Sequence, residues 1–168
     1  VQMVVSANEE KGSPTIRDWY LGGNIHPDYA VGLEPGFPQG PLTPDVPLGV
    51  VYHRRGYGAI RFQVNGFQCH SGTPHDGLNA ISAMAEKIRR IDALSDRERG
   101  LTTNIGVISG GYTPNTDAGE VEAYMSFRFE SQADGDEVLA AIKDILEKPV
   151  LFNEEKGLQD ETTYDIEA

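Results

Sequence analysis

Cysteine is almost absent from this chain, with only Cys69 among 168 residues. One cysteine cannot form a disulfide within the chain, so the composition suits a reducing compartment and we expect a cytoplasmic protein. Iron–sulfur ferredoxins bind their clusters through several cysteine thiolates. The single thiol therefore excludes that class.

Basic residues are also scarce. The chain has 14 lysines and arginines against 26 aspartates and glutamates, a formal net charge of −12 at pH 7. Nucleic acids and anionic membranes are bound through basic patches, so we expect neither as a partner. No apolar run approaches the roughly 20 residues of a membrane-spanning helix.

The first part of the sequence has the pattern of a partial α/β domain. Continuous apolar runs at 1–8 and 29–35 are typical of buried parallel strands, and a capped helical segment at 13–23 lies between them. Two parallel strands do not form a stable sheet alone. Residues 1–52 are therefore predicted to be a βαβ strip of a larger domain, and the chain to be a fragment of a longer protein.

A proline-rich linker at 35–49 separates this strip from a region with a different pattern. In residues 57–66, Ile60, Phe62 and Val64 alternate with polar residues, which predicts a half-buried antiparallel strand. Three more strands are predicted at 102–111, 120–130 and 162–168.

Two helices are predicted between these strands. The first spans about 77–94, and its apolar stripe consists of Ile81, Met84, Ala85, Ile88 and Ile91. The second runs from Asp134, which with Glu137 resembles a capping box, to about Glu147. Residues 53–168 are thus predicted to be an α+β domain of order β-α-β-β-α-β, a four-stranded antiparallel sheet with both helices on one face.

Three glutamates follow the buried strands of the first part. Glu9 and Glu10 come after the first strand and Glu34 after the second, so they should share one edge of a parallel sheet. One carboxylate could bind a metal while another accepts a proton from water. Acidic residues before a helix also favour its dipole. Two carboxylates alone do not make a catalytic metal site.

The stretch "CHSGTPHDGLNA" at 69–80 places His70 at a strand end before a sharp turn. A catalytic base, a metal ligand and a surface histidine all fit that position. Arg128 lies on the polar face of the third strand, where it could bind a carboxylate through two hydrogen bonds or be solvated.

Five motifs together carry a family resemblance: "NEEKGS", "GLEPG", "QVNGFQCHSGTPHDGLNAISA", "GVISGGYTPN" and "MSFRFE", in that order. The chain resembles, over essentially its whole length, the di-zinc metallopeptidase and amidohydrolase family that includes carboxypeptidase G, aminoacylase and succinyl-diaminopimelate desuccinylase. The resemblance implies that residues 53–168 are the lid, or dimerisation, domain and residues 1–52 part of the zinc-binding catalytic domain.

The resemblance also implies a role for each matching residue. Glu9 would be the general base, and Glu10 and Glu34 would each bind one of two zinc ions. His70 would reach across a homodimer to stabilise the oxyanion in the partner's site. Asn115 and Arg128 would bind the substrate's carboxylate.

The remaining zinc ligands of this family, a His-x-Asp motif and a bridging aspartate before the glutamate pair and a histidine after the lid, are not in this chain. The fragment alone is therefore expected to be inactive. The parent enzyme would cleave an amide bond next to a carboxylate-bearing group, in a small peptide or N-acyl amino acid.

A stand-alone β-α-β-β-α-β binding or assembly module is the alternative function. The acidic residues Glu9, Glu10 and Glu34 disfavour it, because such a module has no use for them. An RNA-recognition domain shares the topology but needs a basic sheet with stacking aromatics, which the acidic charge opposes.

Overall fold

The computed structural model describes Asp18, Gly22, Gly23 and residues 54–167. The chain divides into two units between residues 51 and 52, and the sheet and helices belong to the second unit. Apart from Asp18, Gly22 and Gly23, the predicted βαβ strip of residues 1–52, with Glu9, Glu10 and Glu34, lies outside the described residues. Its assignment to a catalytic domain, and the domain boundary at 52/53, stay predictions.

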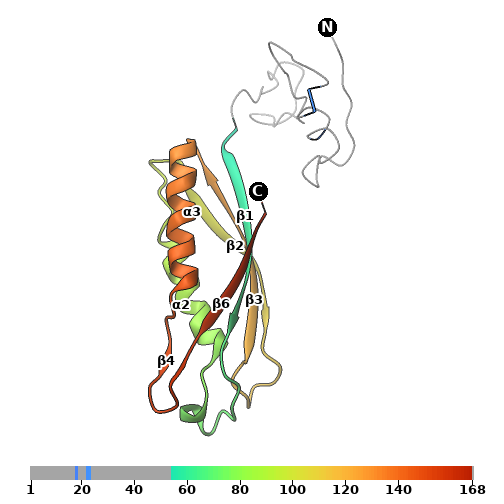
Figure 1. Cartoon of the computed structure of the whole chain (residues 1–168), viewed down its shortest axis with the longest axis vertical. Helices are drawn as coiled ribbons and strands as arrows, with labels where there is room; N and C mark the ends of the chain where they lie inside the picture. Colours follow the sequence, from blue (N-terminus) through green and yellow to red (C-terminus); the bar gives the residue numbers. More distant parts are fainter. Residues whose placement is uncertain (1–17, 19–21, 24–53, 168) are drawn as a thin grey trace, which may run out of the picture. The chain divides into compact units, whose positions relative to one another are not determined.

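Four strands form one antiparallel sheet in the order β2-β3-β1-β6 (Figure 1). The strands are β1 (Gly56–Asn65), β2 (Thr102–Gly110), β3 (Glu120–Phe129) and β6 (Glu161–Glu167). The alternating apolar residues produce this pairing, since all of them can then face the same side. The predicted four-stranded antiparallel sheet is confirmed.

Two helices cover the apolar face of the sheet. Helix α2 (Ala80–Asp92) lies between β1 and β2 in the chain, and α3 (Gln132–Glu147) follows β3. The Asn79 side chain caps α2 by accepting a hydrogen bond from the Ile81 amide. Helix α3 begins two residues earlier than predicted, because Ser131, not Asp134, is its cap. Asp134 donates its amide to Ser131, at 3.2 Å.

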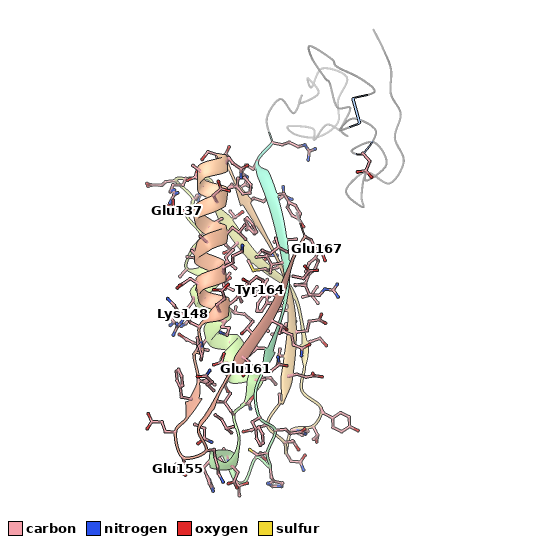
Figure 2. All side chains as sticks on the ribbon, viewed as in Figure 1. Glu137, Lys148, Glu155, Glu161, Tyr164 and Glu167 are labelled. Atoms are coloured by element: carbon pink, nitrogen blue, oxygen red, sulfur yellow. The ribbon has the colours of Figure 1, made fainter. Side chains whose placement is uncertain are left out.

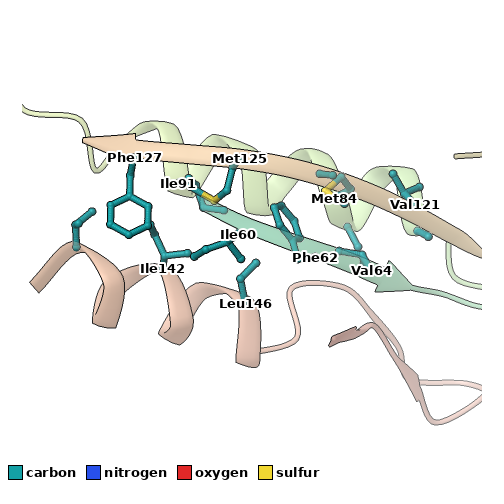
Figure 3. Packing of buried hydrophobic residues seen from close by; sticks show 14 of the residues in the cluster. Ile60, Phe62, Val64, Met84, Ile91, Val121, Met125, Phe127, Ile142 and Leu146 are labelled. Carbon is teal, nitrogen blue, oxygen red and sulfur yellow. The ribbon is translucent and has the colours of Figure 1, made fainter. Parts of the chain in front are cut away.

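The core lies between the sheet and the helices. Figure 3 shows Ile60 of β1 beside Ile142 and Leu146 of α3, with Phe62 further along the same strand. The predicted inward residues Ile60, Phe62 and Val64 are buried. The predicted stripe of α2 is partly wrong, since Ile81 and Ala85 are exposed. The buried residues of this helix are instead Ala80, Ala83, Met84, Lys87 and Ile91.

A buried ion pair joins the two helices to the last strand. The Lys87 Nζ atom lies 3.2 Å from Asp160 Oδ2, and both side chains are completely buried. Lys87 also donates to the carbonyl of Lys148 at the end of α3, at 2.6 Å. Asp160 Oδ1 accepts the amides of Val150 and Leu151 at 2.6 and 2.7 Å. Burial lowers the pKa of Lys87, and the Asp160 carboxylate opposes that shift.

A short hairpin lies between α3 and β6, and the sequence patterns did not predict it. It consists of β4 (Phe152–Asn153) and β5 (Leu158–Gln159), which pair with each other and not with the main sheet. Figure 2 shows Glu155 at its tip. Among residues 54–167, neither α2 nor α3 is long and apolar enough to cross a membrane.

Candidate functional site

His70 and Asn115 come together beyond one end of the sheet. After β1 ends at Asn65, the chain pairs with the segment that precedes β3, and His70 forms an antiparallel bridge with Thr116. The Ser71 amide donates to the Asn115 carbonyl at 2.9 Å. Two of the predicted site residues, 45 positions apart in sequence, thus lie on adjacent segments.

The His70 side chain is exposed, and its ring is held by the following turn. Its Nδ1 atom accepts the Gly72 amide at 2.9 Å. A neutral imidazole with Nδ1 as acceptor carries its proton on Nε2. His70 can therefore donate a hydrogen bond from Nε2 to an anion. Glycine favours this close approach of the residue 72 amide to the His70 ring, since a Cβ atom at Gly72 would lie 3.0 Å from Nδ1.

Asn115 is also exposed and shaped by its own loop. Its Oδ1 atom accepts the Thr113 hydroxyl at 2.7 Å. The side-chain amide group of Asn115 is then the donor that the loop presents. His70 and Asn115 together offer two neutral donors on one end of the domain, an arrangement suited to carboxylates and oxyanions.

Asp117 holds the two ends of the loop that carries His70. Its Oδ1 accepts a hydrogen bond from the Asn79 side-chain Nδ2 at 3.2 Å, and its Oδ2 accepts one from the Cys69 thiol at 3.4 Å. Partial burial, followed by the hydrogen bond to Asp117, raises the pKa of Cys69. The thiol therefore keeps its proton at neutral pH and remains a donor. Sequence analysis missed Asp117, whose only signal was its place two residues after Asn115.

Arg128 lies at the opposite end of the sheet. It pairs in register with Tyr57 on β1, and its guanidinium carbon lies 5.5 Å from the centre of the tyrosine ring. Arg128 is eight positions along β3 from Glu120, which at ~3.3 Å per residue is roughly 26 Å. Within one chain, the structure does not bring Arg128 to His70 and Asn115.

An open hollow of about 370 Å³ lies beside the His70 bridge. Gln68, Thr116, Glu120 and the glycine turn after β2 line it. Tyr112, also in its wall, is 96% exposed. The His70 end of the domain therefore presents polar groups and an aromatic ring to solvent.

A metal site needs donors from beyond the described domain. In the part of the chain that the structure describes, no three histidine, cysteine, aspartate or glutamate side chains come together in a way that could hold a metal ion. A catalytic zinc takes about three protein ligands. Residues 54–167 do not fit that ion, and the predicted ligands Glu10 and Glu34 are not described.

Strand β2 is an edge of the sheet with exposed apolar residues. It pairs with β3 on one side, and among residues 54–167 no strand pairs with its other side. Val107 and Ile108 are 58% and 54% exposed, next to a bulge at Gly106. Ile81 of α2, 46% exposed, lies near Gly111 at the end of this strand. Such an edge is suited to pairing with another strand.

Residues 52–153 match the family model of the peptidase dimerisation domain of M20 peptidases. The chain is 27% identical over 140 residues to N-acetyldiaminopimelate deacetylase from Leuconostoc mesenteroides, covering 80% of this chain and 35% of that protein. It is 26% identical to acetylornithine deacetylase from Proteus mirabilis, covering 75% and 33%. The chain thus spans about a third of the length of these curated relatives.

The fold is similar to parts of solved enzymes. A tripeptidase from Staphylococcus aureus matches with a TM-score of 0.54 and 26% identity, over 66% of this chain and 28% of that one. An aminobenzoyl-glutamate utilization protein from Klebsiella pneumoniae matches in fold with a TM-score of 0.54 and 21% identity, over 67% and 27%. The family match covers more than half of the chain, and the described fold agrees with it. The chain belongs to the M20 peptidase dimerisation domain family.

Proposed function

We propose that this chain is the lid, or dimerisation, domain of a zinc-dependent M20 metallopeptidase or amidohydrolase, with part of the catalytic domain in residues 1–52. The family match carries the general class, because its relatives are deacetylases and peptidases. Both curated relatives are named for N-acetylated amino acids, which carry a carboxylate. The proposed substrate is likewise an N-acyl amino acid or small peptide, cleaved at an amide next to a carboxylate-bearing group.

The proposed assembly is a homodimer formed through β2. Its free edge and the exposed side chains of Val107, Ile108 and Ile81 support that interface. Pairing of β2 with its copy about a two-fold axis would join the two sheets into one.

A two-fold pairing also supports a role for His70 in the partner's site. Antiparallel copies of β2 would place the Thr102 end of one strand opposite the Gly110 end of the other. Thr102 is in register with Arg128, whereas Gly110 lies near the end with His70 and Asn115. The dimer would thus bring one subunit's Arg128 and the partner's His70 to the same end of the joined sheet, although the two residues lie at opposite ends of the sheet in one chain.

In this proposal His70 donates Nε2–H to the oxyanion that develops when water attacks the amide carbonyl. The Gly72 amide on Nδ1 supports that role, because it holds the required tautomer. Asn115 and Arg128 bind the substrate carboxylate, and Glu9 accepts the proton of the attacking water. Zinc, when bound in the complete enzyme with Glu10 and Glu34 among its ligands, would supply Lewis-acid polarisation of the carbonyl.

The test is an activity assay on the longer protein proposed to contain this chain, with a panel of N-acetyl amino acids and dipeptides. We expect hydrolysis that a chelator abolishes and zinc restores, and no hydrolysis by residues 1–168 alone. If the longer protein cleaves none of these substrates but dimerises, the alternative function, a stand-alone assembly module, is favoured. The enzyme is expected in the cytoplasm.

A further inference from the structure

The β4–β5 hairpin lies against the loop that carries His70. Its contact is made by Asn153, the last residue of β4. The Asn153 side-chain amide nitrogen donates to the carbonyls of His75 and Gly77, at 2.9 and 2.8 Å. Both protons of this group are therefore used on the backbone of the His70 loop. Figure 2 shows the hairpin, with Glu155 at its tip, beside that loop.

A second contact joins the hairpin to the same loop. Lys156 Nζ lies 3.0 Å from Asp76 Oδ1. This hydrogen bond lowers the pKa of Asp76 and raises that of Lys156, so both groups are charged at neutral pH. The Asn153 Oδ1 atom accepts the Lys156 amide at 3.2 Å and so closes the hairpin itself. Asn153 thus has two separable functions, one on each side-chain atom.

The held segment is connected to His70 by consecutive backbone hydrogen bonds. The Thr73 amide donates to the His70 carbonyl at 2.9 Å, and the Asp76 amide to the Thr73 carbonyl at 3.0 Å. The Gly77 amide follows with a bond to the Pro74 carbonyl at 3.4 Å. A shift of residues 75–77 would therefore alter the turn that orients the His70 ring.

The hairpin is itself anchored in the core. Asp160, directly after β5, accepts the amides of Val150 and Leu151, which lead into β4. Lys87 of α2 holds the Asp160 carboxylate in the buried ion pair. The hairpin therefore has a fixed base from which Asn153 can hold a loop that is itself mostly exposed.

We propose that Asn153 is a positioning residue for His70: its amide group fixes the 70–77 loop and thereby the direction of the His70 donor. The proposal rests on the proposed function of His70. Asn153 touches neither substrate nor reacting atoms in this account. It acts through backbone carbonyls 78 and 76 residues away in sequence.

The test compares Asn153→Asp, Lys156→Gln and a control, Glu154→Gln, in the longer active protein. Asn153→Asp keeps the Oδ1 acceptor for the Lys156 amide but loses both donors to the loop. Glu154 is exposed on the same hairpin. Amide hydrogen exchange at Asp76 and Gly77 reports the loop, and kcat and KM report the His70 donor. Thermal unfolding checks that each variant is folded.

Asn153→Asp should speed exchange of these two amides by about 10-fold and lower kcat by about 10-fold, with KM changed less than about 2-fold. Lys156→Gln should change both amide exchange and kcat in the same direction but less strongly. Glu154→Gln should change neither amide exchange nor kcat. In a His70→Ala background, Asn153→Asp should lower kcat no further, because the positioned group is gone. If Asn153→Asp does not fold, Lys156→Gln tests the same contact between the hairpin and the His70 loop.

Unchanged amide exchange in Asn153→Asp would overturn the proposal. So would faster exchange in Asn153→Asp with an unchanged kcat, provided that His70→Ala does lower kcat. An equal loss in both backgrounds would also overturn it, since Asn153 would then act independently of His70. If His70→Ala itself leaves kcat unchanged, the proposed function of His70 has failed. The proposal for Asn153 then fails with it, and the exchange data would show only an ordered loop.

Discussion

Lys87 Nζ and Asp160 Oδ2 lie 3.2 Å apart in the middle of an otherwise apolar core, and neither side chain is exposed. A buried charge is costly unless it is paired and hydrogen-bonded. Lys87 satisfies this condition through Asp160 and through carbonyls at the end of α3, including that of Lys148. The pair therefore connects α2, α3 and the start of β6.

Replacing Lys87 alone should be strongly destabilising. Lys87→Met leaves the Asp160 charge buried without a partner, which should lower the free energy of unfolding by roughly 3–5 kcal/mol. Urea denaturation of residues 1–168 measures this. The double variant Lys87→Met with Asp160→Asn should be more stable than Lys87→Met, because Asn keeps an acceptor for Val150 and Leu151 without the charge. A Lys87→Met loss under about 1 kcal/mol would contradict the structure.

Glu86 should make stability depend on pH. Hydrogen bonds from Arg89 and then Arg90 lower its pKa from the usual 4.5 to about 2. Because the folded-state pKa is depressed, its contribution is fully present above pH 4.5 and is lost as the pH falls toward 2. The stability difference between the native protein and Glu86→Gln should therefore be constant from pH 7 down to about 5 and shrink below it.

Chemical denaturation at a series of pH values checks this dependence. Gln in place of Glu98, an exposed residue outside α2, serves as the control for loss of one negative charge. A difference for Glu86→Gln that stays the same between pH 7 and pH 2.5 would mean that the two arginines do not act on this carboxylate.

Charge on the β2 edge should prevent self-association. Val107→Lys with Ile108→Lys should raise the dimer dissociation constant by at least roughly 100-fold, because pairing of the two β2 edges would bring like charges from both copies together at the interface. The matched control is Thr163→Lys on β6, the other edge of the sheet. Sedimentation at micromolar concentration measures how much dimer each of these two variants forms. Equal effects at both edges, or a monomeric native protein, would exclude the β2 interface.

The neutral form of the His70 ring should be the Nε2–H tautomer. The Gly72 amide occupies Nδ1 at 2.9 Å, so that nitrogen cannot carry the proton. Nitrogen-15 chemical shifts of the imidazole identify the protonated atom. Gly72→Ala should disturb this preference, because the new Cβ would lie 3.0 Å from Nδ1. An Nδ1–H signal in the native protein would remove the donor that the mechanism uses.

The sequence predicted the sheet well because strand patterns are local. Ile60, Phe62 and Val64 face one side in a strand by simple alternation, and all three are buried. The face of α2 was predicted less well. The pattern counted large apolar residues such as Ile81, whereas the contact with the sheet selects small alanines and the paired Lys87.

The candidate site could be predicted only by resemblance. His70 and Asn115 meet because segments beyond β1 and β3 continue to pair, which no local pattern indicates. Asp117 and Asn153 were missed for the same reason. Their partners lie 38 and 76 residues away, at Asn79 and Gly77, and a hydrogen bond to a backbone carbonyl leaves no mark on the sequence of its acceptor.

The most direct test of a His70 that acts in the partner's site is complementation between two inactive variants of the longer protein. His70→Ala and Glu9→Ala should each lose activity, the former by roughly 10²–10³. After subunit exchange, a mixed dimer has one site with an intact Glu9 and the partner's intact His70. That site should work at close to the native rate. If exchange is demonstrated and activity does not return, His70 acts within its own subunit or outside the site.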